Sequence, residues 1–149
     1  MIQLCCPCDR LPVVLPERVD TEFCAWLRGL PWLVAIVLHA NHANELDANV
    51  AAACARLRDT GATLLNQSVL LRGINDSVDA LATLSARLFD CGALPYYLHQ
   101  LDRVAGAAHF AVNDDDARAL IEALRARLPG YLLPRLVREI AGEPHKTPL

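Results

Sequence analysis

The chain has 149 residues, of which 54% are hydrophobic and 21% charged, and its formal net charge is −3. This length and composition suit one globular domain with a substantial core. The slight negative charge argues against a surface that binds nucleic acid or acidic membranes. No apolar run reaches the roughly 18 residues that a membrane span needs. Residues 1–8 lack the basic start and apolar stretch of a secretory signal, so we expect a cytoplasmic protein.

Short apolar runs alternate with helix-like segments along the chain. The pattern predicts strands at residues 11–15, 32–38, 63–71, 94–98 and 131–137. Strands that alternate with helices indicate a parallel sheet with helices outside it, and nearly continuous apolar runs are typical of strands covered on both faces. A complete eight-fold barrel needs about 250 residues. We therefore expect an α/β fold with about five parallel strands, either part of a (βα) barrel or a small open sheet.

Capping residues mark the helices between these strands. The helices are expected at residues 21–27, 47–59, 75–91 and 113–128. Asp47 is the expected N-cap of the second helix, and Gly61 suits its C-terminal turn. No linker or low-complexity segment divides the chain, so these elements belong to one domain.

Polar side chains follow the apolar runs. These residues include His39, Asn41 and His42 after the second run, Asn66 and Gln67 within the third, Asp102 after the fourth, and Glu139 and Lys146 after the fifth. In parallel α/β folds the active site lies at the C-terminal ends of the strands. We therefore expect these side chains to converge on one edge of the sheet.

Each of these residues also has a purely structural interpretation. A histidine in a loop is often just solvated, Asp102 could cap a turn, and Glu139 could pair with a neighbouring arginine. By composition alone, Lys146 is a basic residue in a disordered tail, because a lysine that forms a Schiff base also needs a carbonyl cofactor to capture. Asn66 and Gln67 are more informative. Adjacent strand residues point to opposite faces, and a buried polar group costs a few kcal/mol unless it is paired, so one should face a cavity and the other the helices.

Six cysteines are present, and three of them cluster at Cys5, Cys6 and Cys8. A structural zinc needs about four ligands, and no other cysteine or histidine lies near this cluster in the sequence. We therefore predict no metal site. Cys24 and the other two scattered cysteines are expected to be free thiols that fill apolar space.

Four stretches resemble the lysine 2,3-aminomutase family, in the family's order. They are residues 39–45 (HANHANE), 66–76 (NQSVLLRGIND), 95–102 (PYYLHQLD) with His109 and Phe110 after it, and 130–134 (GYLLP) followed by Gly142 and 146–148 (KTP). The resemblance runs from about Leu11 onward. The segment GEPHK at 142–146 is most similar to the branch that makes (R)-β-lysine for elongation factor P, because the classical branch has a run of glycines before the lysine. The resemblance implies the C-terminal part of a radical-SAM-type barrel.

The resemblance also implies a mechanism and assigns residues to it. In the family, a [4Fe-4S] cluster cleaves S-adenosylmethionine to a radical that removes a hydrogen from the β-carbon of lysine, while pyridoxal phosphate holds the α-amino nitrogen. Lys146 matches the catalytic lysine that anchors pyridoxal phosphate. Asp102 and Glu139 match the acidic positions that hold the distal ammonium of the substrate lysine, although the family has aspartate at the second. The residues that match the side facing S-adenosylmethionine are His39, Asn41, His42, Asn66 and Gln67.

One motif of the family is absent. The cluster motif is C-x-x-x-C-x-x-C, and the spacing of Cys5, Cys6 and Cys8 does not match it. We therefore expect residues 1–10 to be an unrelated or disordered leader and 11–149 to be the C-terminal part of the barrel, a fragment inactive alone that self-associates through exposed strand edges. The alternative is a non-catalytic remnant that binds pyridoxal phosphate or lysine, and a weaker one is a metal-binding protein that uses the three cysteines.

Overall fold

A computed structural model describes residues 4–5, 10–102 and 108–149 of the chain. Its sheet has six strands in the order β1-β2-β3-β4-β5-β6. The strands are β1 (Leu4–Cys5), β2 (Val34–His39), β3 (Thr63–Leu70), β4 (Ala93–Gln100), β5 (Arg135–Arg138) and β6 (Thr147–Pro148). The first five are parallel, and β6 runs antiparallel to β5. Since each parallel strand lies beside its predecessor, the chain winds in one direction, as in a (βα) barrel.

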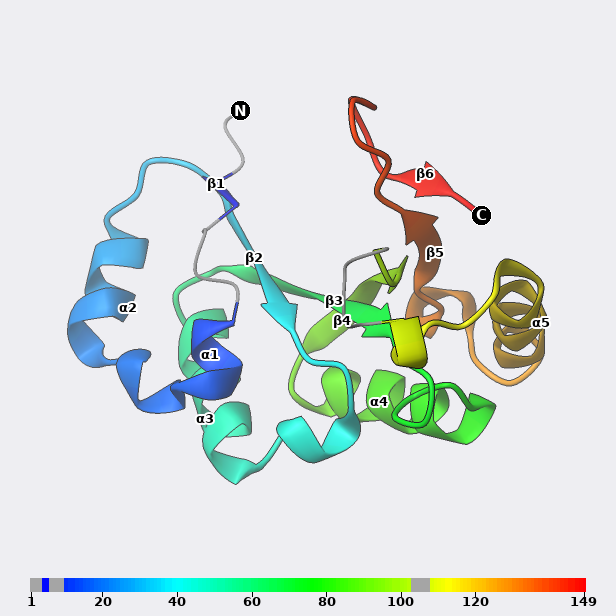
Figure 1. Cartoon of the computed structure of the whole chain (residues 1–149). Coiled ribbons are helices and arrows are strands. Elements are labelled where there is room, and N and C mark those ends of the chain that lie inside the picture. Colours follow the sequence, from blue (N-terminus) through cyan, green and yellow to red (C-terminus); the bar gives the residue numbers. More distant parts are fainter. Residues whose placement is uncertain (1–3, 6–9, 103–107) are drawn as a thin grey trace.

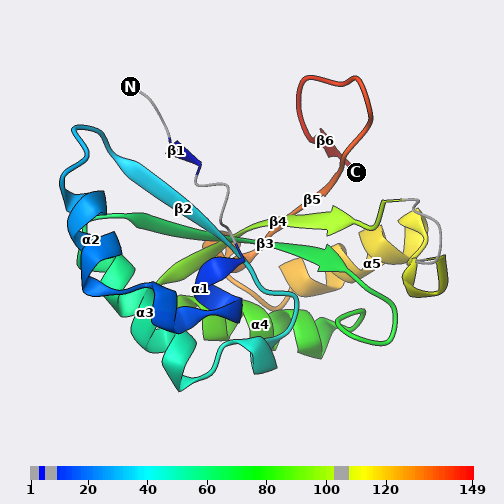
Figure 2. The same ribbon diagram turned by 60° about the vertical axis from the view of Figure 1, so that its left-hand side comes forward.

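The helices cover one face of this sheet (Figures 1 and 2). They are α1 (Leu11–Val14), α2 (Thr21–Arg28), α3 (Ala48–Arg58), α4 (Val78–Asp90) and α5 (Asp114–Arg125). Short 3-10 turns connect several elements: η1 (Pro16–Arg18), η2 (Ala43–Glu45), η3 (Ala108–Phe110) and η4 (Gly130–Leu132). The predicted partial barrel with outer helices is confirmed. Within the part of the chain that the structure describes, no helix is long and apolar enough to cross a membrane.

The predicted helix starts are confirmed by their caps. The Asp47 carboxylate accepts hydrogen bonds from the backbone N–H groups of Asn49 and Val50, at 2.8 and 2.9 Å. The Ser77 hydroxyl and the Asn113 amide oxygen cap α4 and α5 in the same way. Such side chains satisfy backbone donors that a helix start leaves without partners. Gly61, with φ of +89°, makes the left-handed turn after α3.

The first predicted strand is wrong. Residues 11–15 begin with the short helix α1, because Pro12 in the first turn has the φ that a helix start needs and donates no hydrogen bond to a sheet. Leu11 and Val13 pack against the helix-side core instead. The strand beside β2 is Leu4–Cys5, which lies within the predicted leader. Residues 1–3 and 6–9 lie outside the described residues.

The core lies between the sheet and its helices, and the other sheet face is half-exposed. In β3 the side chains of Leu64, Asn66, Ser68 and Leu70 are buried, whereas those between them are only partly covered. The expectation that both faces of the strands are covered is therefore not met in the described residues. We call the face opposite the helices the open face.

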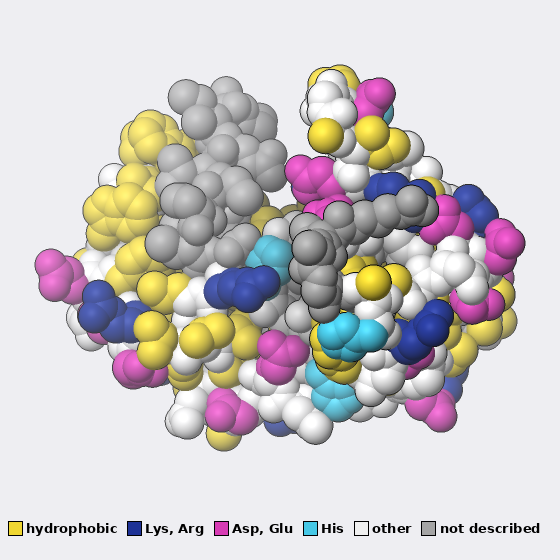
Figure 3. Space-filling model, in the orientation of Figure 1, with side chains coloured by type: hydrophobic (Ala, Val, Ile, Leu, Met, Phe, Trp, Pro, Cys, Tyr) yellow, Lys and Arg dark blue, Asp and Glu magenta, His cyan; other side chains and the backbone are white. Residues whose placement is uncertain are grey.

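The α1–α2 end of the molecule carries exposed apolar side chains (Figure 3). Leu33 is 76% exposed, Val14 65% and Trp26 49%. The scattered cysteines behave as predicted: Cys24, Cys54 and Cys91 are free and buried. Burial raises the pKa of the Cys54 thiol to about 12, so this thiol stays protonated and inert.

Candidate functional site at the carboxyl ends of the strands

Three polar side chains from three adjacent strands meet on the open face. The register places His39 of β2 opposite Gln67 of β3, and Val69 opposite His99 of β4. The Gln67 amide nitrogen donates to Nε2 of His39, and its oxygen accepts from Nε2 of His99 at 3.2 Å. Because an amide nitrogen only donates, Nε2 of His39 must be the acceptor, while Nε2 of His99 carries a proton. Gln67 thus fixes the orientation of both rings.

His99 is a neutral imidazole beside charged groups. Burial lowers its pKa most, and the positive charge of Lys146 lowers it further, while the Glu139 carboxylate acts in the opposite direction. The Tyr97 ring packs edge-on against the His99 ring, with centroids 5.7 Å apart. Lys146 and Glu139 therefore belong to the same site as the bridge formed by Gln67.

Lys146 lies opposite Glu139 because of the C-terminal hairpin. Strand β6 pairs antiparallel with β5, with Thr147 opposite Arg138. Glu139 follows β5 and Lys146 precedes β6, so the two residues lie next to this ladder, and their side chains form an ion pair. The Lys146 side chain is 31% exposed and that of Glu139 59%. The interpretation of Lys146 as part of a disordered tail is therefore wrong.

A glycine makes this hairpin possible. Gly142 has φ of +89°, a left-handed conformation that other residues rarely adopt. Next to it, the backbone N–H of Glu143 donates to the carbonyl of Ile140 at 3.0 Å and closes a turn. The loop after β5 rises away from the helix layer before β6 returns to the sheet (Figure 2). The turn and the pairing together place Lys146 at the strand ends.

Two cavities adjoin this ion pair, and Glu139 lines both. One, of about 350 Å³, is lined by Lys146 with Tyr97, Glu143, Pro144 and His145. The other, of about 840 Å³, is lined by Asp102 together with Arg72 and Gln100. The structure thus brings Asp102 and Glu139, predicted to hold the substrate's ammonium, to one cavity beside the predicted cofactor lysine.

The structure gives Asn66 a different place from the one predicted. Its side chain is 1% exposed and faces the helices, where it bonds the backbone N–H and carbonyl of Ala40 at 2.9 and 3.1 Å. Its amide also donates to the Ser68 hydroxyl. Because both N–H groups are used inside the protein, a contact with S-adenosylmethionine is not supported for Asn66. The expectation that Asn66 and Gln67 face opposite sides is confirmed.

Asn41 and His42 lie just beyond β2 and shape its loop. The Asn41 side-chain oxygen accepts from the Val69 backbone N–H at 2.8 Å and so ties this loop to β3. Nδ1 of His42 accepts from the Asn44 backbone N–H, and His42 begins the turn η2 with Glu45 in a capping box. Both residues lie near His39 at the same edge of the sheet.

Several known proteins are similar to this chain over nearly its whole length. No family model matches the chain. It is 52% identical to an L-lysine 2,3-aminomutase of Escherichia coli (strain K12) over 141 residues, which cover 95% of this chain and 41% of that protein. It is 50% identical to the enzyme of the same name from Haemophilus influenzae and 39% identical to that of Clostridium subterminale, over 93% and 95% of the chain. The chain belongs to the lysine 2,3-aminomutase family.

The chain spans about two fifths of the length of these aminomutases, and the matched part is their C-terminal part. A glutamate 2,3-aminomutase of Clostridioides difficile is also similar, at 34% identity over 94% of the chain and 33% of that protein. Among solved structures, a radical SAM methyltransferase from Sphaerobacter thermophilus has a TM-score of 0.54 and 22% identity, over 78% of this chain and 37% of the methyltransferase. That likeness shows a shared fold.

Sequence reasoning did not assign to the candidate site one residue that shapes it. Asn75, which follows the third apolar run and opens the next predicted helix, is fully buried. Its oxygen accepts from the Leu71 N–H at 2.7 Å, and its amide donates to the carbonyls of Asn41 and Val69 at 2.8 and 2.9 Å. It therefore joins the loops that follow β2 and β3. It lies between Gly73-Ile74 and Asp76-Ser77 in the sequence, a loop-like setting that does not mark it as buried.

The prediction about a metal site at the clustered cysteines can be compared with the structure only in part. Cys6 and Cys8 lie outside the described residues. Among the residues that the structure does describe, no three His, Cys, Asp or Glu side chains are grouped so that they could hold a metal ion. The described residues therefore do not fit the iron–sulfur cluster of radical SAM chemistry.

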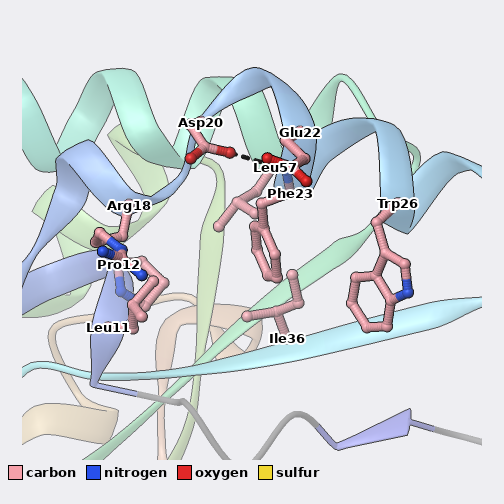
Figure 4. Close-up of a pocket in the computed structure, with 9 residues that line it drawn as sticks. All are labelled: Leu11, Pro12, Arg18, Asp20, Glu22, Phe23, Trp26, Ile36 and Leu57. Carbon is pink, nitrogen blue, oxygen red and sulfur yellow. Dashed lines mark hydrogen bonds between the residues drawn. The ribbon is translucent and has the colours of Figure 1, made fainter.

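A separate cavity of about 390 Å³ lies between α1, α2 and β2 (Figure 4). Phe23 and Trp26 point into it from α2 toward Ile36, and their rings stack with centroids 5.8 Å apart. Asp20 caps α2 by accepting from the Phe23 backbone N–H at 2.8 Å. None of the predicted aminomutase residues lines this cavity.

Proposed function

We propose that this chain is the C-terminal part of a lysine 2,3-aminomutase, which converts L-α-lysine to β-lysine with S-adenosylmethionine and pyridoxal phosphate. The observation that carries the proposal is Lys146. It is the only lysine among the 149 residues, and its half-buried amine lies opposite Glu139 at the strand ends. The identity to lysine aminomutases, up to 52%, supports the same reaction.

Lys146 is the proposed anchor of pyridoxal phosphate. Lys146 would hold the cofactor through Nζ, because a neutral amine condenses with an aldehyde and releases water. The bound cofactor would supply an electron-accepting ring that holds the substrate's α-amino nitrogen. The cavity beside Lys146 offers the Tyr97 ring as a wall. Among the described residues that line it, His145 is the only other basic side chain, so this cavity fits the aldehyde end better than the phosphate.

Asp102 and Glu139 are proposed to bind the side-chain ammonium of lysine. Carboxylates form strong, charge-assisted hydrogen bonds with an ammonium and repel a carboxylate. The family also contains a glutamate 2,3-aminomutase. The cavity also contains Arg72, Arg138 and Asp114, with Arg138 paired to Asp114, so the preference for lysine rests on Asp102 and Glu139 matching the family's ammonium-binding positions.

His39, Asn41, His42 and Gln67 are proposed to line the side of the site that S-adenosylmethionine approaches. Because the described residues do not fit a cluster, we derive no radical step from this chain and expect residues 11–149, as one domain, to be inactive alone. The proposed cellular role is the supply of β-lysine for elongation factor P in the cytoplasm. A non-catalytic protein that binds pyridoxal phosphate or lysine is the second candidate, since Lys146 and the carboxylates need no cluster.

Reductive trapping tests the anchor. Pyridoxal phosphate is added to the purified chain and borohydride is used to fix any C=N bond, and the modified residue is located by peptide mass spectrometry. We expect modification at Lys146, with loss of the imine absorbance in Lys146→Ala. Lys146→Arg is the matched control, because it keeps a cation opposite Glu139 but lacks a reactive amine. Full fixed signal in Lys146→Ala would show that the anchor is wrong.

A further inference from the structure

A histidine directly precedes Lys146 in the chain and borders the same cavity. His145 and Lys146 both line the cavity of about 350 Å³. In a fully extended strand, adjacent side chains point to opposite faces. His145 lies instead in a bend just before β6, and both side chains border one space. The resemblance to the aminomutases assigns no role to His145.

Lys146 needs a group that takes a proton from it. Its ion pair with Glu139 favours the charged form of the lysine. The hydrogen bond from Lys146, and then its positive charge, lower the pKa of the Glu139 carboxyl, so Glu139 is a poor acceptor for the lysine proton. An amine combines with a carbonyl carbon only in its neutral form. Attachment of pyridoxal phosphate at Lys146 therefore requires another proton acceptor.

His145 is the described side chain on this cavity that suits the transfer. The other titratable side chains that line it are two carboxylates, a tyrosine and Lys146 itself. Histidine both accepts and releases a proton near neutral pH. Carboxylates hold a proton poorly there, and tyrosine hydroxyls already carry one. His145 is also exposed to solvent, so water can restore its protonation state.

The other histidine near Lys146 is less suited to this transfer. Burial and then the charge of Lys146 lower the pKa of His99, which makes its ring a weaker base. Nε2 of His99 already donates to the Gln67 amide oxygen. His99 is also not among the described residues that line the cavity beside Lys146.

We propose that His145 is the proton-transfer residue for the bond between Lys146 and pyridoxal phosphate. The inference rests on the proposed function, in which Lys146 is the anchor. His145 takes one proton from the Lys146 ammonium, and the neutral Nζ forms a C=N bond while the C=O bond of the aldehyde breaks. The proton on His145 and a second proton from Nζ leave with the oxygen as water. The third proton stays on the C=N nitrogen, so none is gained or lost overall.

The same imidazole serves the exchange with the substrate. The α-amino group of lysine must also be neutral before its nitrogen takes the cofactor carbon from Lys146. His145 accepts a proton from that α-ammonium and returns it to Nζ of Lys146 as this amine leaves. One side chain thus moves a proton in both directions at the anchor.

The rate of attachment tests this role, because a proton-transfer residue changes the rate and not the final extent. Pyridoxal phosphate is mixed with the purified 149-residue chain near neutral pH, and the imine absorbance is followed by stopped flow. We expect His145→Gln to form the same amount of adduct at Lys146 about a hundredfold more slowly, at the lower end of the usual range for a positioned acid or base. His109→Gln removes a histidine that is not among the described lining residues and should react like the wild type.

Added imidazole separates proton transfer from packing. In His145→Ala, imidazole in the buffer should restore the rate, whereas pyrazole, a ring of the same size but a far weaker base, should not. Circular dichroism checks that each variant is folded, and His145→Gln gives the comparison if His145→Ala is not. Equal rates in the wild type and the folded variants, or a slow His145→Ala that imidazole does not restore, overturn the role of His145 while the anchor stands. Absence of an adduct at Lys146 in the wild type overturns the anchor and this proposal together.

Discussion

At the scale of single residues, the site is a set of charges arranged around one neutral imidazole. His99 is held by Gln67 and lies near both Lys146 and Glu139. A cation beside an imidazole disfavours its protonated form, and a carboxylate favours it. The His99 ring is therefore a reporter of the state of Lys146.

The pKa of His99 should rise when the charge of Lys146 is removed. In Lys146→Met, burial still lowers the pKa of His99. The positive charge of Lys146, which lowers it further in the wild type, is gone, and Glu139 is left as a nearby anion. Titration of the His99 ring protons by NMR measures the change. Arg135→Met, which removes a charge from β5 that does not act on His99, should leave the titration unchanged. An unchanged or lower pKa in Lys146→Met would contradict the described geometry.

The residues of this site were predicted unequally well. The opposite orientation of Asn66 and Gln67 follows from strand geometry alone, but which of them faces the helices depends on where the helices pack. Lys146 was assigned by resemblance, since a two-residue strand such as β6 has no periodicity to detect. Pro148 fits that strand because an edge strand tolerates a residue without an N–H group.

At the scale of elements, the sheet edge at β1 and β2 is only partly paired. Strand β1 pairs with β2 only at Val34 and Ala35, which leaves the rest of that edge without a strand partner in the described residues. Exposed apolar side chains, including Leu33 and Trp26, lie at the same end. Such an edge favours pairing with another chain.

We predict that the isolated chain self-associates through this end. Sedimentation velocity should show larger species as the concentration rises. Leu33→Lys places a charge beside the edge and should shift the distribution toward monomer. Ile140→Lys adds the same charge to an exposed residue in the loop after β5 and should change little. A monodisperse wild-type monomer that unfolds cooperatively would count against this interface.

The elements themselves were largely predictable. The sequence predicts α3, α4 and α5, because a side-chain cap at the start of each helix is a clear local signal. The strand predicted at residues 11–15 is wrong, because four apolar residues and a proline suit either a strand or the first turn of a helix. The pairing of β1 and β6 depends on contacts between residues far apart in the sequence, which local pattern does not contain.

At the scale of the whole molecule, the chain is a curved part of a barrel whose strand ends carry the predicted site. The parallel order of the strands brings residues 39, 67, 102 and 139 to one edge, as expected for this topology, and the antiparallel strand β6 adds residue 146. The chain also spans about two fifths of its aminomutase relatives. Its activity is therefore best measured with the remaining part of such an enzyme present.

The most direct measurement joins residues 11–149 to the N-terminal part of the Escherichia coli relative, in place of the matched segment, and follows conversion of lysine to β-lysine. With S-adenosylmethionine, pyridoxal phosphate and a reduced cluster, we predict turnover by this chimera and none by its Lys146→Met variant, although both hold the cluster. No β-lysine from a folded, cluster-loaded chimera, or equal turnover in the Lys146→Met variant, would contradict the account.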